Sequence, residues 1–223
     1  MHVRINGGLL AGAERRTLSF LVARLPARVT PDHLTALALA AMGAAALALT
    51  AARESALAGW LFAACLALNW FGDSLDGTLA RFRRIERPRY GYYIDHVVDL
   101  AGATLLLGGF AASGFMSPAI ALTLLAAYLL AAAETYLATH ATGTFRLSFA
   151  GFGPTELRIA LAAGVLAGRT HLWTDLLGVH ARVFDVAGAA GAVGLAAAFL
   201  VNTVHNGRML SRREPARLAG SAR

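Results

Sequence analysis

The sequence predicts an all-α polytopic membrane protein, with six transmembrane helices preceded by an N-terminal interfacial amphipathic helix and with both termini cytoplasmic. Three observations predict this fold class: an apolar composition, six apolar stretches joined by short loops, and an uneven distribution of arginine. Of the 223 residues, 57% are hydrophobic and only 15% are charged, and the mean hydropathy is +0.56. Ordinary soluble domains are less apolar than this, so a membrane-embedded chain is expected.

The six apolar stretches approach the roughly 20 residues that a helix needs to cross a bilayer. The fifth is the shortest, and the sequence does not define its ends. We expect residues 1–33 to form a cytoplasmic interfacial helix and linker, residues 34–206 a six-helix transmembrane domain, and residues 207–223 a basic cytoplasmic tail. The predicted spans are residues 34–50, 56–71, 92–109, 118–137, 157–170 and 183–204.

Before the first span, "LLAGAERRTLSFLVARLP" predicts an amphipathic helix that lies on the membrane surface. Its apolar side chains share one helical face, and Arg15, Arg16 and Ser19 lie opposite. Pro26 and Pro31 separate this helix from the first span. A soluble amphipathic helix that packs on a partner is the competing interpretation. The apolar face consists of Leu18, Leu21, Val22 and Leu25.

All 20 basic residues are arginine, because the chain contains no lysine. If both termini are cytoplasmic, all arginines except Arg53, Arg169 and Arg182 lie on the cytoplasmic side, as the positive-inside rule requires. The net charge of +7 is then a topology signal and an attraction to anionic lipid headgroups. No nucleic-acid partner is expected.

Residues 73–99, "DSLDGTLARFRRIERPRYGYYIDHVVD", concentrate four aspartates and five arginines in an otherwise apolar chain. On a helix, the first two aspartates share one stripe with two small residues, and the last two share a second stripe. If the two helices are antiparallel neighbours, four carboxylates meet near the cytoplasmic ends of spans two and three. The first stripe consists of Asp73, Asp76, Gly77 and Ala80, with Arg81 at its edge, and the second consists of Gly91, Asp95 and Asp99.

Four ionised carboxylates cannot share a low-dielectric site without cations, since their mutual repulsion opposes it. All the donors are oxygen and no Cys/His cluster accompanies them, so Mg²⁺ or Mn²⁺ fits better than Zn²⁺. Asp73, Asp76 and Asp95 can bridge two ions, the arrangement that clamps entering and leaving oxygens in phosphoryl transfer. Asp99 adds a fourth carboxylate and is also placed to take a proton from an acceptor hydroxyl.

The small residues of the first stripe, Gly77 and Ala80, let a ligand approach the helix backbone, and Arg81 can neutralise a diphosphate. The competing interpretation is that the aspartates pair with the five arginines as a solvated cluster beside the membrane. Two acid pairs on two apolar helices favour a functional site, because intramembrane ionisable groups are functional by default.

These residues resemble the signature of the CDP-alcohol phosphotransferases, and all eight signature residues are present. In addition, "PDHLT" resembles the Pro-Asn-x-Leu-Thr that often opens the first span in this family, with Asp32 in place of the asparagine. The resemblance implies a transferase of phospholipid biosynthesis in which an acceptor hydroxyl attacks the phosphorus of a CDP-linked donor and CMP leaves. The motif is Asp73-x2-Asp76-Gly77-x2-Ala80-Arg81-x9-Gly91-x3-Asp95-x3-Asp99.

By matching position, the resemblance implies that Asp73, Asp76 and Asp95 bind the metal ions and that Asp99 is the base. It also implies a homodimer. The chain resembles the compact prokaryotic members, which implies a place in the inner (cytoplasmic) membrane with the active site facing the cytoplasm. The residues implied to contact the CDP group are Asp73, Gly77, Ala80, Arg81 and Gly91.

The donor and acceptor stay open between two classes. "GPTE" and His96 resemble the choline and ethanolamine phosphotransferases, which take CDP-aminoalcohols and diacylglycerol, and Glu134 or Glu156 could receive an ammonium group. The short chain resembles instead the phosphatidyltransferases that use CDP-diacylglycerol, and Arg146 and Arg158 could bind an acceptor phosphate. Equally, Glu156 suits the first turn of a helix, and both arginines could be topology charges.

Other classes of protein also use intramembrane acids. Prenyltransferases hold a diphosphate with aspartates and Mg²⁺, but they resemble longer chains whose acid motifs lie far apart. An intramembrane cation transporter would place acids near the midplane on several helices and would not need Gly77, Ala80 or Arg81. An intact signature gives no support to a catalytically inactive scaffold.

Overall fold

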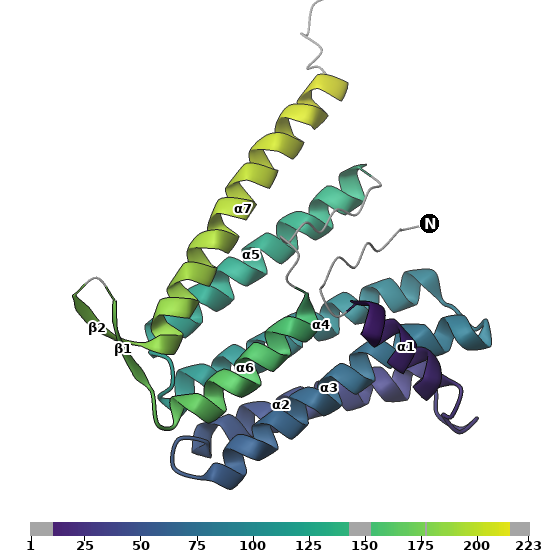
Figure 1. Ribbon diagram of the computed structural model, residues 1–223. Helices are drawn as coiled ribbons and strands as arrows, with labels where there is room; N and C mark the ends of the chain where they lie inside the picture. The colour runs from purple at the N-terminus through teal and green to yellow at the C-terminus, as the bar shows by residue number, and fades with distance from the viewer. Residues whose placement is uncertain (1–10, 143–152, 177, 215–223) are drawn as a thin grey trace, which may run out of the picture.

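The computed structural model describes residues 11–142, 153–176 and 178–214, which form helices and one two-stranded hairpin (Figure 1). The predicted all-helical character is confirmed, although the hairpin was not expected. Its strands pair antiparallel, from Trp173 opposite Arg182 to Leu176 opposite Val179. The elements in chain order are α1 (Ala11–Val22), α2 (Pro31–Ala51), α3 (Ala56–Arg83), α4 (Pro88–Ser113), α5 (Pro118–Thr142), α6 (Pro154–Gly168), β1 (Trp173–Leu176), β2 (Val179–Arg182) and α7 (Val183–Arg213).

Among the described helices, α2, α3, α4, α5 and α7 are long and apolar enough to cross a membrane. Helix α6 stands where the fifth span was predicted, but it has 15 residues. Its axial rise of about 22 Å is shorter than the roughly 30 Å hydrocarbon core of a bilayer. A polytopic membrane protein is therefore confirmed, whereas the sixth span, the interfacial position of α1 and the cytoplasmic termini stay predictions.

Proline and hydroxyl side chains define where the helices begin. The hydroxyl of Thr30 accepts a hydrogen bond from the His33 N–H at the start of α2, and that of Ser55 accepts one from the Ala58 N–H at the start of α3. A proline in the first turn already has a helical φ and lacks an N–H that would have no partner there. Four of the described helices begin with a proline, namely Pro31, Pro88, Pro118 and Pro154.

The helices pack in a chain of neighbours rather than around one axis. Helix α2 contacts both α3 and α4, α6 packs on α3, and α5 joins α4 to α7. In Figure 1 the α5 and α7 pair leans away from α2, α3 and α6, and the C-terminal end of α7 projects beyond its neighbours. The polar segment of residues 73–99 lies at the end of α3 and the start of α4, so both stripes are helical.

The main core lies at the opposite ends of these two helices. Phe110 of α4 packs edge-on against Phe62 of α3, with ring centroids 6.3 Å apart, and lies 5.0 Å from the ring of Phe184 in α7. Phe115 contacts the same Phe184 at 5.8 Å, and all four rings are buried. Aromatic pairs at these separations stabilise beyond their buried area. The main core therefore fixes the helices at the end away from the aspartates.

Arg83, in the last turn of α3, holds the linker between α1 and α2. Its guanidinium donates four hydrogen bonds to backbone carbonyls of that linker, and each satisfies a group that would otherwise need water. Arg83 therefore has a structural role and is not a member of a solvated cluster that pairs with the aspartates. The accepting carbonyls belong to Leu25 (3.1 Å), Pro26 (2.9 Å), Ala27 (3.3 Å) and Val29 (2.5 Å).

Gly72 marks a close approach of α3 to α2. A Cβ built there would lie 2.5 Å from the Leu34 carbonyl oxygen and 2.9 Å from the Cβ of Ala38. We expect Gly72→Ala to lower the free energy of unfolding by roughly 1–3 kcal/mol, because the helices must separate. Thermal unfolding in detergent measures this. Gly108→Ala is the control, since nothing lies within 4 Å of its Cβ, and equal stability of the two variants would contradict close packing at Gly72.

Candidate functional site

Three aspartates from two helices form the centre of the site. Asp73 of α3 and Asp95 and Asp99 of α4 each offer a carboxylate oxygen, and these oxygens lie within 4.8 Å of one another. Asp73 and Asp95 are half-buried, whereas Asp99 is exposed. One aspartate of the first predicted stripe and both aspartates of the second therefore meet. Helices α3 and α4 are joined by the short segment between Arg83 and Pro88, and α2 packs against both of them.

Asp76 does not belong to this group of three, because its carboxylate is directed to α2. The Thr35 hydroxyl donates a hydrogen bond of 2.6 Å to Oδ2 of Asp76, and the Gly77 N–H donates one of 2.5 Å to Oδ1. A carboxylate that accepts two hydrogen bonds is held in one orientation. Thr35 was not among the candidate residues, although it ends the "PDHLT" segment.

Helix α6 brings a guanidinium to the aspartates. Nη2 of Arg158 forms an ion pair of 2.6 Å with Oδ2 of Asp73, and both side chains are largely shielded, with 17% and 26% of their surface exposed. Nε of Arg158 donates to Oδ1 of Asn69 at 2.8 Å, and the Asn69 amide in turn donates to the Ala38 carbonyl at 2.9 Å. Arg158 is thus tied to α3 and, through Asn69, to α2.

The remaining signature residues lie along the same two helices. The side chain of Arg81 folds back over Gly77, where a Cβ would lie 3.3 Å from Nη1, and Nη2 donates a long 3.4 Å hydrogen bond to Thr78. A Cβ at Gly91 would meet no atom within 4 Å. Ala80 is half-buried on α3. Small residues therefore border the aspartates on both helices.

The other substrate candidates are less central. Glu156 occupies the third position of α6, where its Oε2 accepts a hydrogen bond from the Gly153 N–H at 3.1 Å, which agrees with a helix-capping role. Glu134 of α5 accepts a 2.7 Å hydrogen bond from Asn206 of α7. Arg146 lies outside the described residues.

His96 is packed within an aromatic group between α4 and α5. Its Nδ1 lies 2.6 Å from the Tyr92 carbonyl oxygen, a contact that a protonated Nδ1 satisfies. Its ring centroid lies 4.1 Å from that of Tyr92 and 4.6 Å from that of Tyr136. His96 directly follows Asp95 in the sequence, and these contacts give it a packing role.

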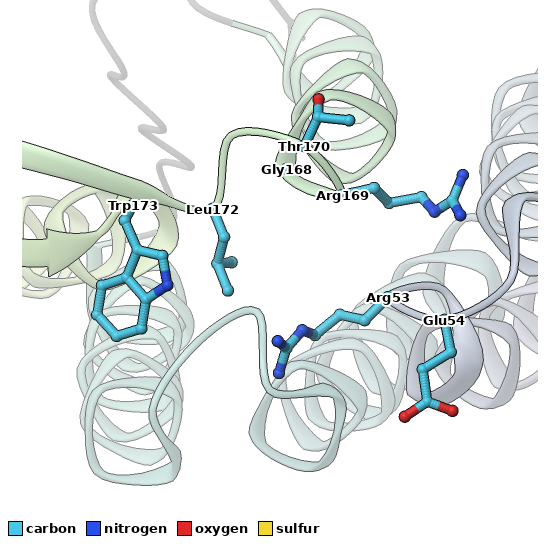
Figure 2. Close-up of a pocket in the computed structure, with 7 residues that line it drawn as sticks. All are labelled: Arg53, Glu54, Gly168, Arg169, Thr170, Leu172 and Trp173. Atoms are coloured by element: carbon cyan, nitrogen blue, oxygen red, sulfur yellow. The ribbon is translucent and has the colours of Figure 1, made fainter.

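A pocket of about 350 Å³ lies at the other end of the bundle, far along α3 from the aspartates (Figure 2). Two guanidinium groups line it, but Figure 2 shows the side chains of Arg53 and Arg169 turned in opposite directions, so they do not converge on one ligand. Among the described residues, those that line this pocket include no group of side chains that could hold a metal ion. It is lined by Arg53, Glu54, Gly168, Arg169, Thr170, Leu172 and Trp173.

The aspartates, rather than this pocket, define the kind of protein. Ionisable side chains gathered on apolar helices are the mark of an integral membrane protein with a functional polar centre. The model of the CDP-alcohol phosphatidyltransferase family matches residues 28–200, and the chain belongs to this family. No curated protein sequence matches the chain.

Family membership establishes the general activity. The protein is an integral membrane transferase of phospholipid synthesis, with a CDP-alcohol as donor and an alcohol as acceptor. The family is generally metal-dependent, and the aspartate group is one that could bind a metal. This agrees with the resemblance carried by the signature, and it leaves the cation transporter and the prenyltransferase without support.

Proposed function

We propose that the protein transfers a substituted phosphate group from a CDP-linked donor to an acceptor hydroxyl and releases CMP. The observation that carries this proposal is the meeting of Asp73, Asp95 and Asp99, which come from two helices and from both halves of the signature. Phosphoryl transfer depends on charge stabilisation and positioning, and a group of carboxylates on rigid helices suits both needs.

The carboxylates fit a divalent metal. Oxygen ligands are those that Mg²⁺ and Mn²⁺ prefer, and we assign Asp73, Asp95 and Asp99 as ligands, with Asp76 as the fourth residue of a site for two ions. When bound, the ions would polarise the diphosphate and neutralise its developing charge. The hydrogen bonds from Thr35 and Gly77 would keep the Asp76 carboxylate oriented.

We assign Asp99 as the general base. It is the exposed member of the group, so a hydroxyl of the acceptor can reach its carboxylate. As the acceptor oxygen forms its bond to the phosphorus, the hydroxyl proton passes to Asp99. The bond between that phosphorus and the bridging oxygen breaks, and CMP leaves with the electron pair.

The CDP group is assigned to the stripe beside the aspartates, where Asp73, Gly77, Ala80, Arg81 and Gly91 would contact it. The open space at Gly91 supports this assignment, because it lets a ligand reach the backbone of α4. The exposed Arg81 guanidinium can turn from its long contact with Thr78 to a diphosphate oxygen.

For the acceptor, we propose that Arg158 and Arg146 bind a phosphate group. The position of Arg158 beside Asp73 supports this, since a cation at that point can bind an anionic group close to the reacting atoms. This favours a phosphatidyltransferase that uses CDP-diacylglycerol over an enzyme for CDP-aminoalcohols. We also propose a cytoplasmic active site, because the arginine-rich segments flank the aspartates, and a homodimer in the membrane.

The test is CMP release by the purified protein in detergent with Mg²⁺. The donors are CDP-diacylglycerol, CDP-choline and CDP-ethanolamine, each offered with a panel of acceptor alcohols that includes glycerol phosphate and inositol phosphate. Metal-dependent CMP from CDP-diacylglycerol with a phosphorylated acceptor is the expected result, and Asp95→Asn should abolish it. CMP from a CDP-aminoalcohol alone would overturn the donor assignment, and no CMP from any donor would overturn the proposal.

Thr35 allows a separate test of the metal site. Thr35→Val removes the hydroxyl that orients Asp76 but keeps the side-chain volume, so we expect about tenfold weaker Mg²⁺ activation. Thr35→Ser keeps the hydroxyl and should restore the wild-type Mg²⁺ dependence. The measurement is the Mg²⁺ concentration that gives half-maximal CMP release, and an unchanged value in Thr35→Val would remove Asp76 from the metal site.

A further inference from the structure

Helix α1 lies across the end of α3 and near the start of α6 (Figure 1). It is fixed there by a small core of its own, in which Leu18 and Val22 are buried with Leu75 and Leu79 of α3. This packing keeps the first turn of α1 beside the polar half of α3. The acidic residue in that turn is Glu14.

One carboxylate oxygen of Glu14 joins two helices. Its Oε1 accepts hydrogen bonds from Nε1 of Trp70 at 2.9 Å and from the Ser74 hydroxyl at 3.3 Å, both on α3. It also accepts one from the Thr155 hydroxyl on α6 at 3.0 Å. Hydrogen bonds to a charged acceptor are stronger than those between neutral groups. Glu14 therefore links α6 to α3 without belonging to either helix.

This link lies next to the reacting centre. Ser74 directly follows Asp73, and Thr155 lies one helical turn before Arg158. Helix α6 is thus held to α3 at two successive points, by Glu14 at Thr155 and by the 2.6 Å ion pair of Arg158 with Asp73. A shift of the first turn of α6 would carry Arg158 away from Asp73.

We propose that Glu14 is a positioning residue for the transfer reaction: it holds the start of α6 against α3 and so places Arg158 beside Asp73. Helix α1 then contributes a residue that supports the reaction site. The expected effect on activity rests on the proposed function. The attachment of α6 to α3 can be measured without any substrate.

The first measurement is hydrogen exchange of the α6 backbone, followed by mass spectrometry of the full-length protein in detergent. We expect Glu14→Ala to speed exchange in the first turns of α6 at least about threefold, because the link to Thr155 is lost. The neighbouring Arg15→Ala, which changes an exposed residue of the same helix, is the matched control. Unchanged exchange in Glu14→Ala would overturn the proposal, whatever the activity of the protein.

The second measurement is the split between KM and kcat. Arg158→Ala identifies the substrate whose KM depends on that guanidinium. Glu14→Ala should raise the KM of the same substrate at least about tenfold and leave the KM of the other within about twofold. Glu14→Gln keeps an oxygen acceptor and should recover most of this loss. A uniform loss of kcat with both KM values unchanged would assign Glu14 a purely structural role and overturn the proposal.

A double-mutant cycle separates the link to α6 from general damage. Thr155→Val should produce the same KM effect as Glu14→Ala, and the double variant should be no worse than Glu14→Ala alone, because both changes remove the hydrogen bond between Glu14 and Thr155. Additive effects would overturn the link. If exchange changes as expected but no variant or wild type releases CMP from any donor, the position of α6 stands while the proposed function fails.

Discussion

Asp99→Asn is expected to lower turnover at least about 100-fold, the contribution typical of a general base. The amide is nearly the same size as the carboxylate, but it cannot accept the proton of the attacking hydroxyl. Because three further aspartates remain, the Mg²⁺ dependence of donor binding should change much less than turnover. Single-turnover CMP release and calorimetric donor titration measure the two quantities separately.

Leu100→Ala, one position further along α4, serves as the control for Asp99→Asn because it changes the helix without removing an acid. It should keep turnover within about threefold, as expected for a change away from the chemistry. Near-normal turnover in Asp99→Asn would refute the assignment of this residue as the base. An equal loss of Mg²⁺-dependent donor binding and turnover would leave Asp99 with the role of a metal ligand alone.

Asp76→Ala is expected to weaken Mg²⁺-dependent donor binding by more than about 100-fold. This loss is larger than the one expected for a residue such as Thr35, which orients a metal ligand but does not itself bind the metal. The substitution removes the carboxylate that Thr35 and Gly77 orient. Metal and donor affinity should fall together, because they share one site. Calorimetry with the donor, in the presence and absence of Mg²⁺, measures the effect.

Asp32→Ala is the control for Asp76→Ala, since Asp32 is an exposed acid that pairs with Arg87 at the surface. Exposed ion pairs contribute little, so this variant should bind donor as the wild type does. Unchanged Mg²⁺-dependent donor affinity in Asp76→Ala would show that metal and donor do not share a site containing this residue.

The sequence was sufficient to predict the helical class and the meeting of Asp73 with Asp95 and Asp99, because both follow from periodicity within short segments. Periodicity places Asp73 on one face of α3 and Asp95 and Asp99 on one face of α4. It does not specify side-chain rotamers. Asp76 shares the stripe of Asp73, but its carboxylate turns to Thr35, a partner 41 positions earlier in the chain.

Long-range polar contacts were beyond the reach of the sequence patterns. Nothing near Glu14 indicates that it would accept hydrogen bonds from Trp70 and Thr155, because the partners are distant in the chain. Asn69 was not predicted either, because it lies inside an apolar span and its partners, Arg158 and Ala38, are also distant in the chain. The hairpin of Trp173–Leu176 and Val179–Arg182 was not predicted because four-residue strands are too short to show alternation.

The four hydrogen bonds of Arg83 restrict where the chain can be lengthened. A reporter peptide or label inserted between Leu25 and Val29 would separate the carbonyls that share one guanidinium, and α1 would lose its fixed distance from α3. The hairpin tip at Gly178 is exposed and has a positive φ of 80°, and such loop tips tolerate insertions well. A fluorophore for distance measurements thus belongs at the hairpin, with the linker kept at its native length.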